Sequence, residues 1–250
     1  MTVAVIGKGG VGKTTVSALL LRRLLELRQT PVLAVDADPS NCLGPALGVT
    51  VGETLADMRE ELRENSRPAS MSAGEWLALR AEEAMVESSG FDLLTMGRPE
   101  GKGCYCYVNN LIRDHLDRLS RSYRHVLLDC EAGLEHLSRR TSGRPDVLVC
   151  VTNRSLMGAR TIERALSLYA DLNGGLPPRV DLVLNQFEEG EPLALEMAAL
   201  AAGTVASFTR VYVLPEDSQV ASFESEGKSL LELSPSCPAP AALREWEIGV

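Results

Sequence analysis

Short runs of apolar, often β-branched residues alternate along the chain with longer stretches in which apolar residues recur every three or four positions. The short runs are apolar throughout, which is typical of parallel strands with both faces covered. This alternation predicts an α/β fold with a mostly parallel twisted sheet and helices on both faces. Strands are predicted at residues 3–6, 32–36, 91–96, 125–129, 147–151, 180–184 and 210–213. Helices are predicted at residues 13–28, 54–64, 73–87, 108–121, 157–172, 192–202 and 241–246.

Composition narrows the range of functions. The 250 residues include 25 Lys and Arg against 34 Asp and Glu, which gives a formal net charge of −9. This balance argues against a protein that binds nucleic acid or anionic membranes mainly through charge. The stretch nearest to a membrane span, residues 197–208, is too short to cross a bilayer. The first residues lack a basic region and cleavage site, so we expect one cytoplasmic domain over residues 1–250, with a tail at about 234–250.

A phosphate-binding loop follows the first predicted strand. Residues 7–14 read Gly-Lys-Gly-Gly-Val-Gly-Lys-Thr and fit the pattern G-x-x-x-x-G-K-[ST], ahead of a predicted helix. Glycines let backbone N–H groups turn toward phosphate oxygens, and the helix N-terminus adds positive potential. Lys13 is expected to reach the β and γ phosphates, and the Thr14 hydroxyl to hold Mg²⁺. The predicted nucleotide contacts are Gly9, Gly10, Val11, Gly12, Lys13, Thr14 and Thr15.

Carboxylates follow two of the predicted strands. Asp36 and Asp38 end the second strand, where the crevice of an open α/β sheet binds its ligands. We expect Asp38 to position and polarise the attacking water, although a turn or helix-cap role also fits an aspartate here. Asp36 is expected to bond either Mg²⁺-bound water or the loop itself. Asp129 ends the strand at residues 125–129 and resembles a Walker B aspartate, which binds Mg²⁺ through water.

The early lysine Lys8 makes the phosphate loop resemble the deviant Walker A motif of the MinD/ParA/ArsA/nitrogenase-iron-protein class. In that class this lysine crosses a two-fold interface to the partner's nucleotide. The resemblance therefore implies an ATP-hydrolysing P-loop homodimer in which Lys8 acts in trans, with Lys13 and Asp38 as the other catalytic residues. Asn185 resembles the residue that reads adenine, and it lacks the following Lys and Asp of a GTPase motif. Pro215 lies in a segment that resembles the base-stacking loop, although an ordinary turn also fits.

Cys104-Tyr105-Cys106 is the second informative pattern. One chain offers two thiolates here, whereas tetrahedral Zn²⁺ and square-planar Ni²⁺ each take four ligands. A two-fold dimer would supply two cysteines from each subunit. This is the same dimer that Lys8 implies, so two independent features favour one geometry. Buried apolar thiols or an oxidisable pair remain alternatives for these cysteines.

Residues 97–113, around the cysteine pair, and residues 129–140 resemble CooC-type ATPases. These proteins insert nickel into carbon monoxide dehydrogenase, and related proteins serve acetyl-CoA synthase. The resemblance implies that Cys104 and Cys106 of both subunits bind Ni²⁺ or Zn²⁺ in a dimer promoted by nucleotide and metal, and that one of these enzymes is the client. Cys42 departs from the family pattern, where Asn is more usual. His136 could be a further ligand, but a structural histidine also fits.

Two other functions compete with nickel insertion. A positioning ATPase of the ParA/MinD type would need a basic surface or a basic amphipathic C-terminal helix. The tail at residues 241–250 is instead short and net acidic. An electron donor like the nitrogenase iron protein would bridge its subunits with a [4Fe–4S] cluster, for which four thiolates per dimer suffice in number. The cluster cysteines of that protein, however, lie in two separate segments.

Overall fold

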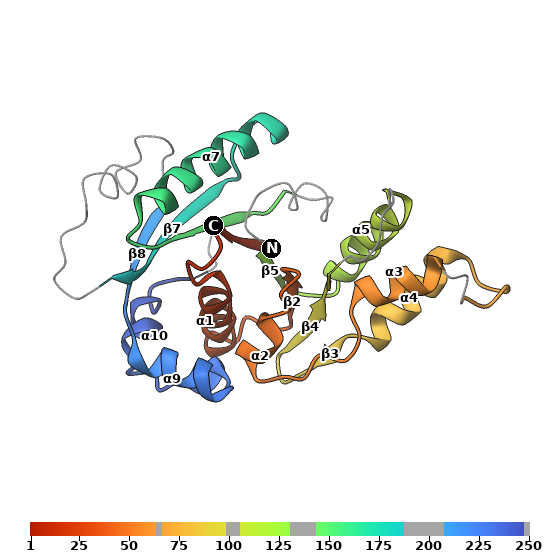
Figure 1. The fold of residues 1–250 in the computed structure, drawn as a ribbon, viewed down its shortest axis with the longest axis horizontal. Coiled ribbons are helices and arrows are strands. Elements are labelled where there is room, and N and C mark those ends of the chain that lie inside the picture. The colour runs from red at the N-terminus through yellow and green to blue at the C-terminus, as the bar shows by residue number, and fades with distance from the viewer. Residues whose placement is uncertain (64–66, 99–105, 131–143, 188–207, 248–250) are drawn as a thin grey trace.

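The computed structural model describes residues 1–63, 67–98, 106–130, 144–187 and 208–247. Its strands are β1 (Thr2–Gly7), β2 (Val32–Ala37), β3 (Val86–Glu87), β4 (Phe91–Thr95), β5 (His125–Cys130), β6 (Val147–Thr152), β7 (Arg179–Phe187) and β8 (Arg210–Pro215). They form one twisted sheet in the order β3-β4-β2-β5-β1-β6-β7-β8 (Figure 1). All neighbouring strands are parallel except the pair β3 and β4. The predicted α/β fold with a mostly parallel sheet is confirmed.

The described helices are α1 (Lys13–Glu26), α2 (Leu43–Leu47), α3 (Leu55–Arg63), α4 (Ala73–Glu83), α5 (Cys106–Ser120), α7 (Leu156–Asn173), α9 (Ser218–Glu226) and α10 (Pro238–Ala242), with a 3₁₀ turn at Leu230–Glu232. The prediction of a helix over residues 73–87 was wrong at its end, because Val86–Glu87 pairs with β4. The predicted helix at 241–246 was also wrong, because the helix there begins at Pro238 and ends at Ala242. The predicted helix at 192–202 lies outside the described residues. No helix in the described ranges is long and apolar enough to cross a membrane.

Two layers of helices bury the two faces of the sheet in separate apolar cores. One core contains the inner faces of α3, α4, α5 and α7, with Trp76, Ile162 and Phe187 among its members. The other contains α1, α2 and the C-terminal segment, with Leu20 and Trp246 fully buried in it. Figure 1 shows α1, α2, α9 and α10 together on one side of the sheet and α7 on the other. Both faces of the central strands are therefore covered, which explains their unbroken apolar runs.

The parallel register brings the ends of the central strands to one edge. Asp36 of β2 is the direct register partner of Asp129 of β5. Gly7, at the end of β1, is paired with Val151 of β6. The loops after these strands therefore meet at the carboxyl edge, where open α/β sheets bind their ligands.

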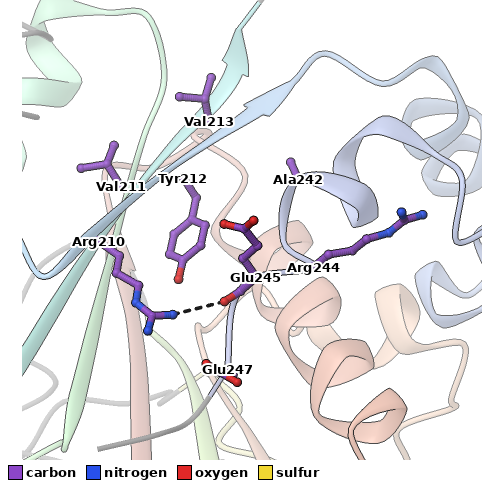
Figure 2. A pocket seen from close by; sticks show the side chains of 8 residues that line it. All are labelled: Arg210, Val211, Tyr212, Val213, Ala242, Arg244, Glu245 and Glu247. Atoms are coloured by element: carbon purple, nitrogen blue, oxygen red, sulfur yellow. Dashed lines mark hydrogen bonds between the residues drawn. The ribbon is translucent and has the colours of Figure 1, made fainter.

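Residues 245–247 are hydrogen-bonded to the first residues of β7 and β8, at the amino ends of these strands. Arg179 forms a bidentate pair with the fully buried Asp181, and its second amine donates to the Glu247 carbonyl at 2.8 Å. The indole N–H of Trp246 also donates to Asp181, at 3.2 Å. Arg210 donates to the Glu245 carbonyl at 3.2 Å (Figure 2). The hollow of about 700 Å³ that Figure 2 shows beside β8 contains none of the predicted site residues.

Candidate active site

The loop between β1 and α1 has the backbone of an anion-binding loop. Gly12, the N-cap of α1, adopts a left-handed conformation with φ 88° and ψ 31°. Gly10 also has a positive φ, of 79°. Glycine adopts these angles without strain, and a methyl group on Gly12 would overlap the side-chain amide of Asn185. The loop therefore ends at the positive N-terminus of a 14-residue helix, which favours bound phosphate.

The lysines and hydroxyls of this loop point to different partners. Lys13 is 7% exposed, and its ammonium donates to the Lys8 carbonyl at 3.3 Å. Lys8 itself is exposed at the rim of the loop. The Thr14 hydroxyl donates to one carboxylate oxygen of Asp129 at 2.7 Å, and the Ser17 hydroxyl donates to the other at 3.1 Å. Sequence reasoning missed Ser17, although its place one helical turn after the loop, among apolar residues, was a usable signal.

The carboxylates of Asp36 and Asp129 are buried on neighbouring strands at the carboxyl edge of the sheet. Burial raises the pKa of Asp129 to about 6, against the hydrogen bonds of Thr14 and Ser17 and the charge of Lys13, which lower it. Burial also raises the pKa of Asp36 to about 7, and the charge of Asp129 adds to the effect. Paired carboxylates beside a threonine hydroxyl are the hard oxygen donors that Mg²⁺ prefers. These residues therefore fit Mg²⁺, which Thr14 and Asp129 would hold and which would neutralise charge on bound phosphates.

Asp36 builds the loop that carries Asp38. One oxygen of Asp36 accepts from the Asp38 backbone N–H at 3.2 Å, and the other accepts from the Leu43 N–H at 2.9 Å. Of the two expectations for Asp36, the structure shows the bond to the loop. Asp38 is partly exposed, and its carboxylate accepts from the Ser40 N–H at 2.9 Å. The arrangement leaves a carboxylate at the mouth of the site, where a water molecule could reach it.

Asn185 and Pro215, far apart in sequence, meet at the other end of the loop. The Asn185 side chain is buried, and its amide donates to the Val11 carbonyl at 2.9 Å. Thr15, Asn185 and Pro215 line one small pocket of about 110 Å³ between α1, β7 and α9. Glu224 of α9 lines it too and accepts a hydrogen bond from the Thr15 hydroxyl at 2.6 Å. Glu224 was not predicted, because no local pattern ties α9 to the phosphate loop.

The predicted nickel or zinc ligands lie largely outside the described residues. Cys104 lies outside the described residues, as does His136, and Cys106 is described only as the first backbone position of α5. In the part of the chain that is described, no three His, Cys, Asp or Glu side chains gather as metal ligands. Among the other cysteines, Cys42 is exposed, and those at positions 130, 150 and 237 are buried.

Sequence comparisons place the chain in a known group. A model of the CobQ/CobB/MinD/ParA nucleotide binding domain matches residues 2–231. The chain is 46% identical over 176 residues to an uncharacterized ATP-binding protein of Methanocaldococcus jannaschii, and the match covers 69% of each. It is 31% identical over 260 positions to the carbon monoxide dehydrogenase accessory protein CooC of Rhodospirillum rubrum, over 95% of this chain and 92% of that protein.

Solved structures with low sequence identity share the fold. A ParA family ATPase from Chlorobium tepidum superposes with a TM-score of 0.71 at 19% identity, over 98% of this chain and 96% of that one. The septum site-determining protein MinD of Pyrococcus horikoshii, solved with Mg-ADP, has a TM-score of 0.68 at 23% identity, over 98% and 93%. The family match over most of the sequence and the loop geometry agree. The chain therefore belongs to the CobQ/CobB/MinD/ParA family of nucleotide-binding domains, and it is an ATPase of the MinD/ParA class.

Proposed function

We propose that the protein is an ATP-hydrolysing metallochaperone that carries Ni²⁺ to a nickel enzyme such as carbon monoxide dehydrogenase or acetyl-CoA synthase. The observation that carries the proposal is the relationship to CooC over 95% of the chain, together with the Cys104–Cys106 pair. Two thiolates from each subunit of a homodimer would give the four soft ligands that Ni²⁺ or Zn²⁺ accepts. The metal is cargo in this scheme, and ATP is the substrate that drives its transfer.

The residues around the phosphate loop support the hydrolytic half of the proposal. The oxygen of a water molecule held by Asp38 would attack the γ-phosphorus, and the bond from that phosphorus to the oxygen it shares with the β-phosphate would break. Lys13 would neutralise charge on the β and γ phosphates from within the subunit. Lys8, exposed at the rim, is free to reach the nucleotide of a partner subunit. ATP would thereby favour the closed dimer and the shared thiolate site, and hydrolysis would release both.

The test measures metal and oligomeric state in the same sample. The chelated, reduced protein is loaded with Ni²⁺ with and without a non-hydrolysable ATP analogue, and size-exclusion chromatography with light scattering is followed by metal counting in each peak. We expect a dimer that holds one Ni²⁺ per two chains. The double substitution Cys104→Ser and Cys106→Ser should lose the metal and keep ATP hydrolysis.

Cys42→Ser is the matched control, because Cys42 is an exposed cysteine outside the predicted metal site, on the loop after β2. It should keep the full metal content. Stoichiometric Ni²⁺ that survives the double substitution would refute the metallochaperone proposal. A nucleotide-driven dimer with no bound metal would also refute it, and would leave an ATPase with another output.

The second candidate function is a positioning ATPase of the ParA/MinD type. It is supported by the likeness in fold to ParA and MinD structures at TM-scores of 0.71 and 0.68, which concerns the fold alone. Such a protein would bind DNA or a lipid surface when it holds ATP. Co-sedimentation with DNA or with anionic phospholipid vesicles distinguishes the two functions. ATP-dependent pelleting would favour positioning, whereas a protein that stays in the supernatant and binds Ni²⁺ would favour metal delivery.

A further inference from the structure

A β-bulge at the end of β7 lies directly beside the phosphate loop. The pairing of β7 with β8 runs in regular register up to Leu184 and Val213, and then resumes at Phe187 and Pro215. From Leu184 to Phe187 the chain advances three residues, whereas from Val213 to Pro215 it advances two, so β7 contains one extra residue. Gln186 lies in the extra stretch with φ 63°, a left-handed conformation that a glutamine rarely adopts. Strained backbone of this kind is concentrated at binding sites.

The bulge changes which face of the sheet each side chain occupies. Side chains alternate along a regular strand, so Phe187 would share a face with Val183. Val183 packs in the core on the α1 side. Phe187 instead packs in the opposite core, together with Leu182 and Leu184. The extra residue has therefore moved Phe187 from the α1 side of the sheet to the α7 side.

The side of the sheet that Phe187 leaves is the side of the small pocket at Asn185. Leu19 and Leu214, which belong to the α1-side core, line this pocket, and Asn185 and Gln186 form its wall on β7. The strand end is held in its new place because the Phe187 carbonyl accepts from the Glu216 N–H at 2.9 Å. Without the bulge, the phenyl ring would point to the side on which Asn185 meets the Val11 carbonyl.

We infer that the bulge at Gln186 creates the nucleotide-base pocket: it keeps the Phe187 ring out of the space that the base needs, on the side of the sheet where Asn185 lines the pocket. Gln186 is a positioning residue in this scheme, because its backbone conformation acts through Phe187. The inference rests on nucleotide binding at the phosphate loop. It concerns the base end of the site, so binding of the phosphates alone does not depend on it.

Three variants separate conformation from side chain. Gln186→Gly keeps the bulge, because glycine accepts a positive φ, and it should bind a fluorescent ATP analogue like the wild type. Gln186→Val disfavours that φ and should weaken binding by about tenfold, the change expected when about 1.4 kcal/mol of interaction is lost. Gln186→Val combined with Phe187→Ala should recover part of the loss, because no ring can then turn into the pocket.

Inorganic triphosphate has no base, so its binding tests the phosphate loop alone. General structural damage would weaken its binding, whereas loss of the base pocket would leave its binding unchanged. Competition by triphosphate at the phosphate loop should be unchanged in all three variants, and urea unfolding shows whether each variant is folded. If Gln186→Gly lost as much ATP affinity as Gln186→Val, or if the folded Gln186→Val protein bound ATP within twofold of the wild type, the inference would be wrong. If Gln186→Val does not fold, a loss of ATP affinity in Gln186→Gly would refute the inference. A wild-type protein that binds triphosphate but not ATP would instead contradict the proposed function.

Discussion

Replacement of Asp129 by asparagine should stabilise the nucleotide-free protein while it removes the magnesium site. Asp129 is 1% exposed, and its two oxygens accept hydrogen bonds only from hydroxyl groups, those of Thr14 and Ser17, among the bonds described. A hydroxyl can also accept, so an asparagine can accept from one partner and donate to the other. The substitution therefore keeps the hydrogen bonds and removes a buried negative charge, which is costly in a low-dielectric interior.

The magnitude follows from the pKa of Asp129. Burial raises this pKa from 3.8 to about 6, so the folded protein holds the proton more tightly than the unfolded chain does. The free energy of unfolding consequently falls as the pH rises from about 4 to about 6, and a rise of this size corresponds to at most about 3 kcal/mol. Asparagine has no charge to lose. Asp129→Asn should therefore match the wild type near pH 4 and exceed it above pH 6, where about 3 kcal/mol equals about 6–12 °C in Tm for a chain of this size.

The assay is thermal and urea unfolding between pH 4 and 8, in EDTA and without nucleotide. Asp171→Asn, at an exposed position on α7, is the matched control and should leave the pH profile unchanged. With Mg²⁺ and ATP, the wild type should gain stability and Asp129→Asn should gain much less, because the cation loses its carboxylate. A variant that is less stable than the wild type at pH 8 would refute the reasoning, as would a difference between the two that does not change with pH.

Three further predictions follow from single contacts. Trp246→Ala should cost about 3–5 kcal/mol of unfolding free energy in urea, because the indole is fully buried and its N–H is bonded to Asp181. Gly12→Ala should abolish ATP binding in a fluorescence titration while the fold persists, because the new methyl group meets the Asn185 amide at a positive φ. His125 should destabilise the protein as the pH falls from about 6.5 to about 4, because burial lowers its pKa to about 4 and the unfolded chain takes up the proton first. In His125→Gln, the free energy of unfolding measured in urea should fall less between pH 6.5 and pH 4.

The parts of the fold that were predicted correctly are those with local causes. Each central strand is an apolar run bounded by polar residues, and the phosphate loop is a contiguous motif, so both can be recognised without any knowledge of neighbours in space. The missed elements depend on tertiary contacts. β3 has only two residues and exists through its pairing with β4. α9 buries none of its residues fully, so its pattern is weak, although the Asp217 N-cap and Gly227 after its end were readable signals.

The same distinction applies within the site. Lys13, Thr14 and Asp129 were predicted from motifs, and in the structure Thr14 bonds Asp129 and the charge of Lys13 acts on the same carboxylate. The bulge at Gln186 was invisible, because the residues after Leu184 continue a plausible strand and only the pairing with β8 shows the extra residue. The helix predicted at residues 241–246 was wrong for a related reason. Trp246 completes a helical pattern in sequence, but the residue is placed by its bond to Asp181 and by burial, not by a helix.

The proposed roles of Lys8 and of the cysteine pair both need a second subunit. In the proposed dimer, Lys8 would reach the partner's nucleotide, and the two cysteines of each subunit would together supply four metal ligands. If ATP and Ni²⁺ each bind the closed dimer better than the open form, they must assist one another. The factor by which ATP tightens Ni²⁺ binding then equals the factor by which Ni²⁺ tightens ATP binding. A coupling of 1–3 kcal/mol, about 5–150-fold, is the usual range, and both factors can be measured by titration of a hydrolysis-deficient Asp38→Ala protein. A factor of one, meaning that neither ligand changes the affinity for the other, would show that the two ligands do not act through the same closed dimer.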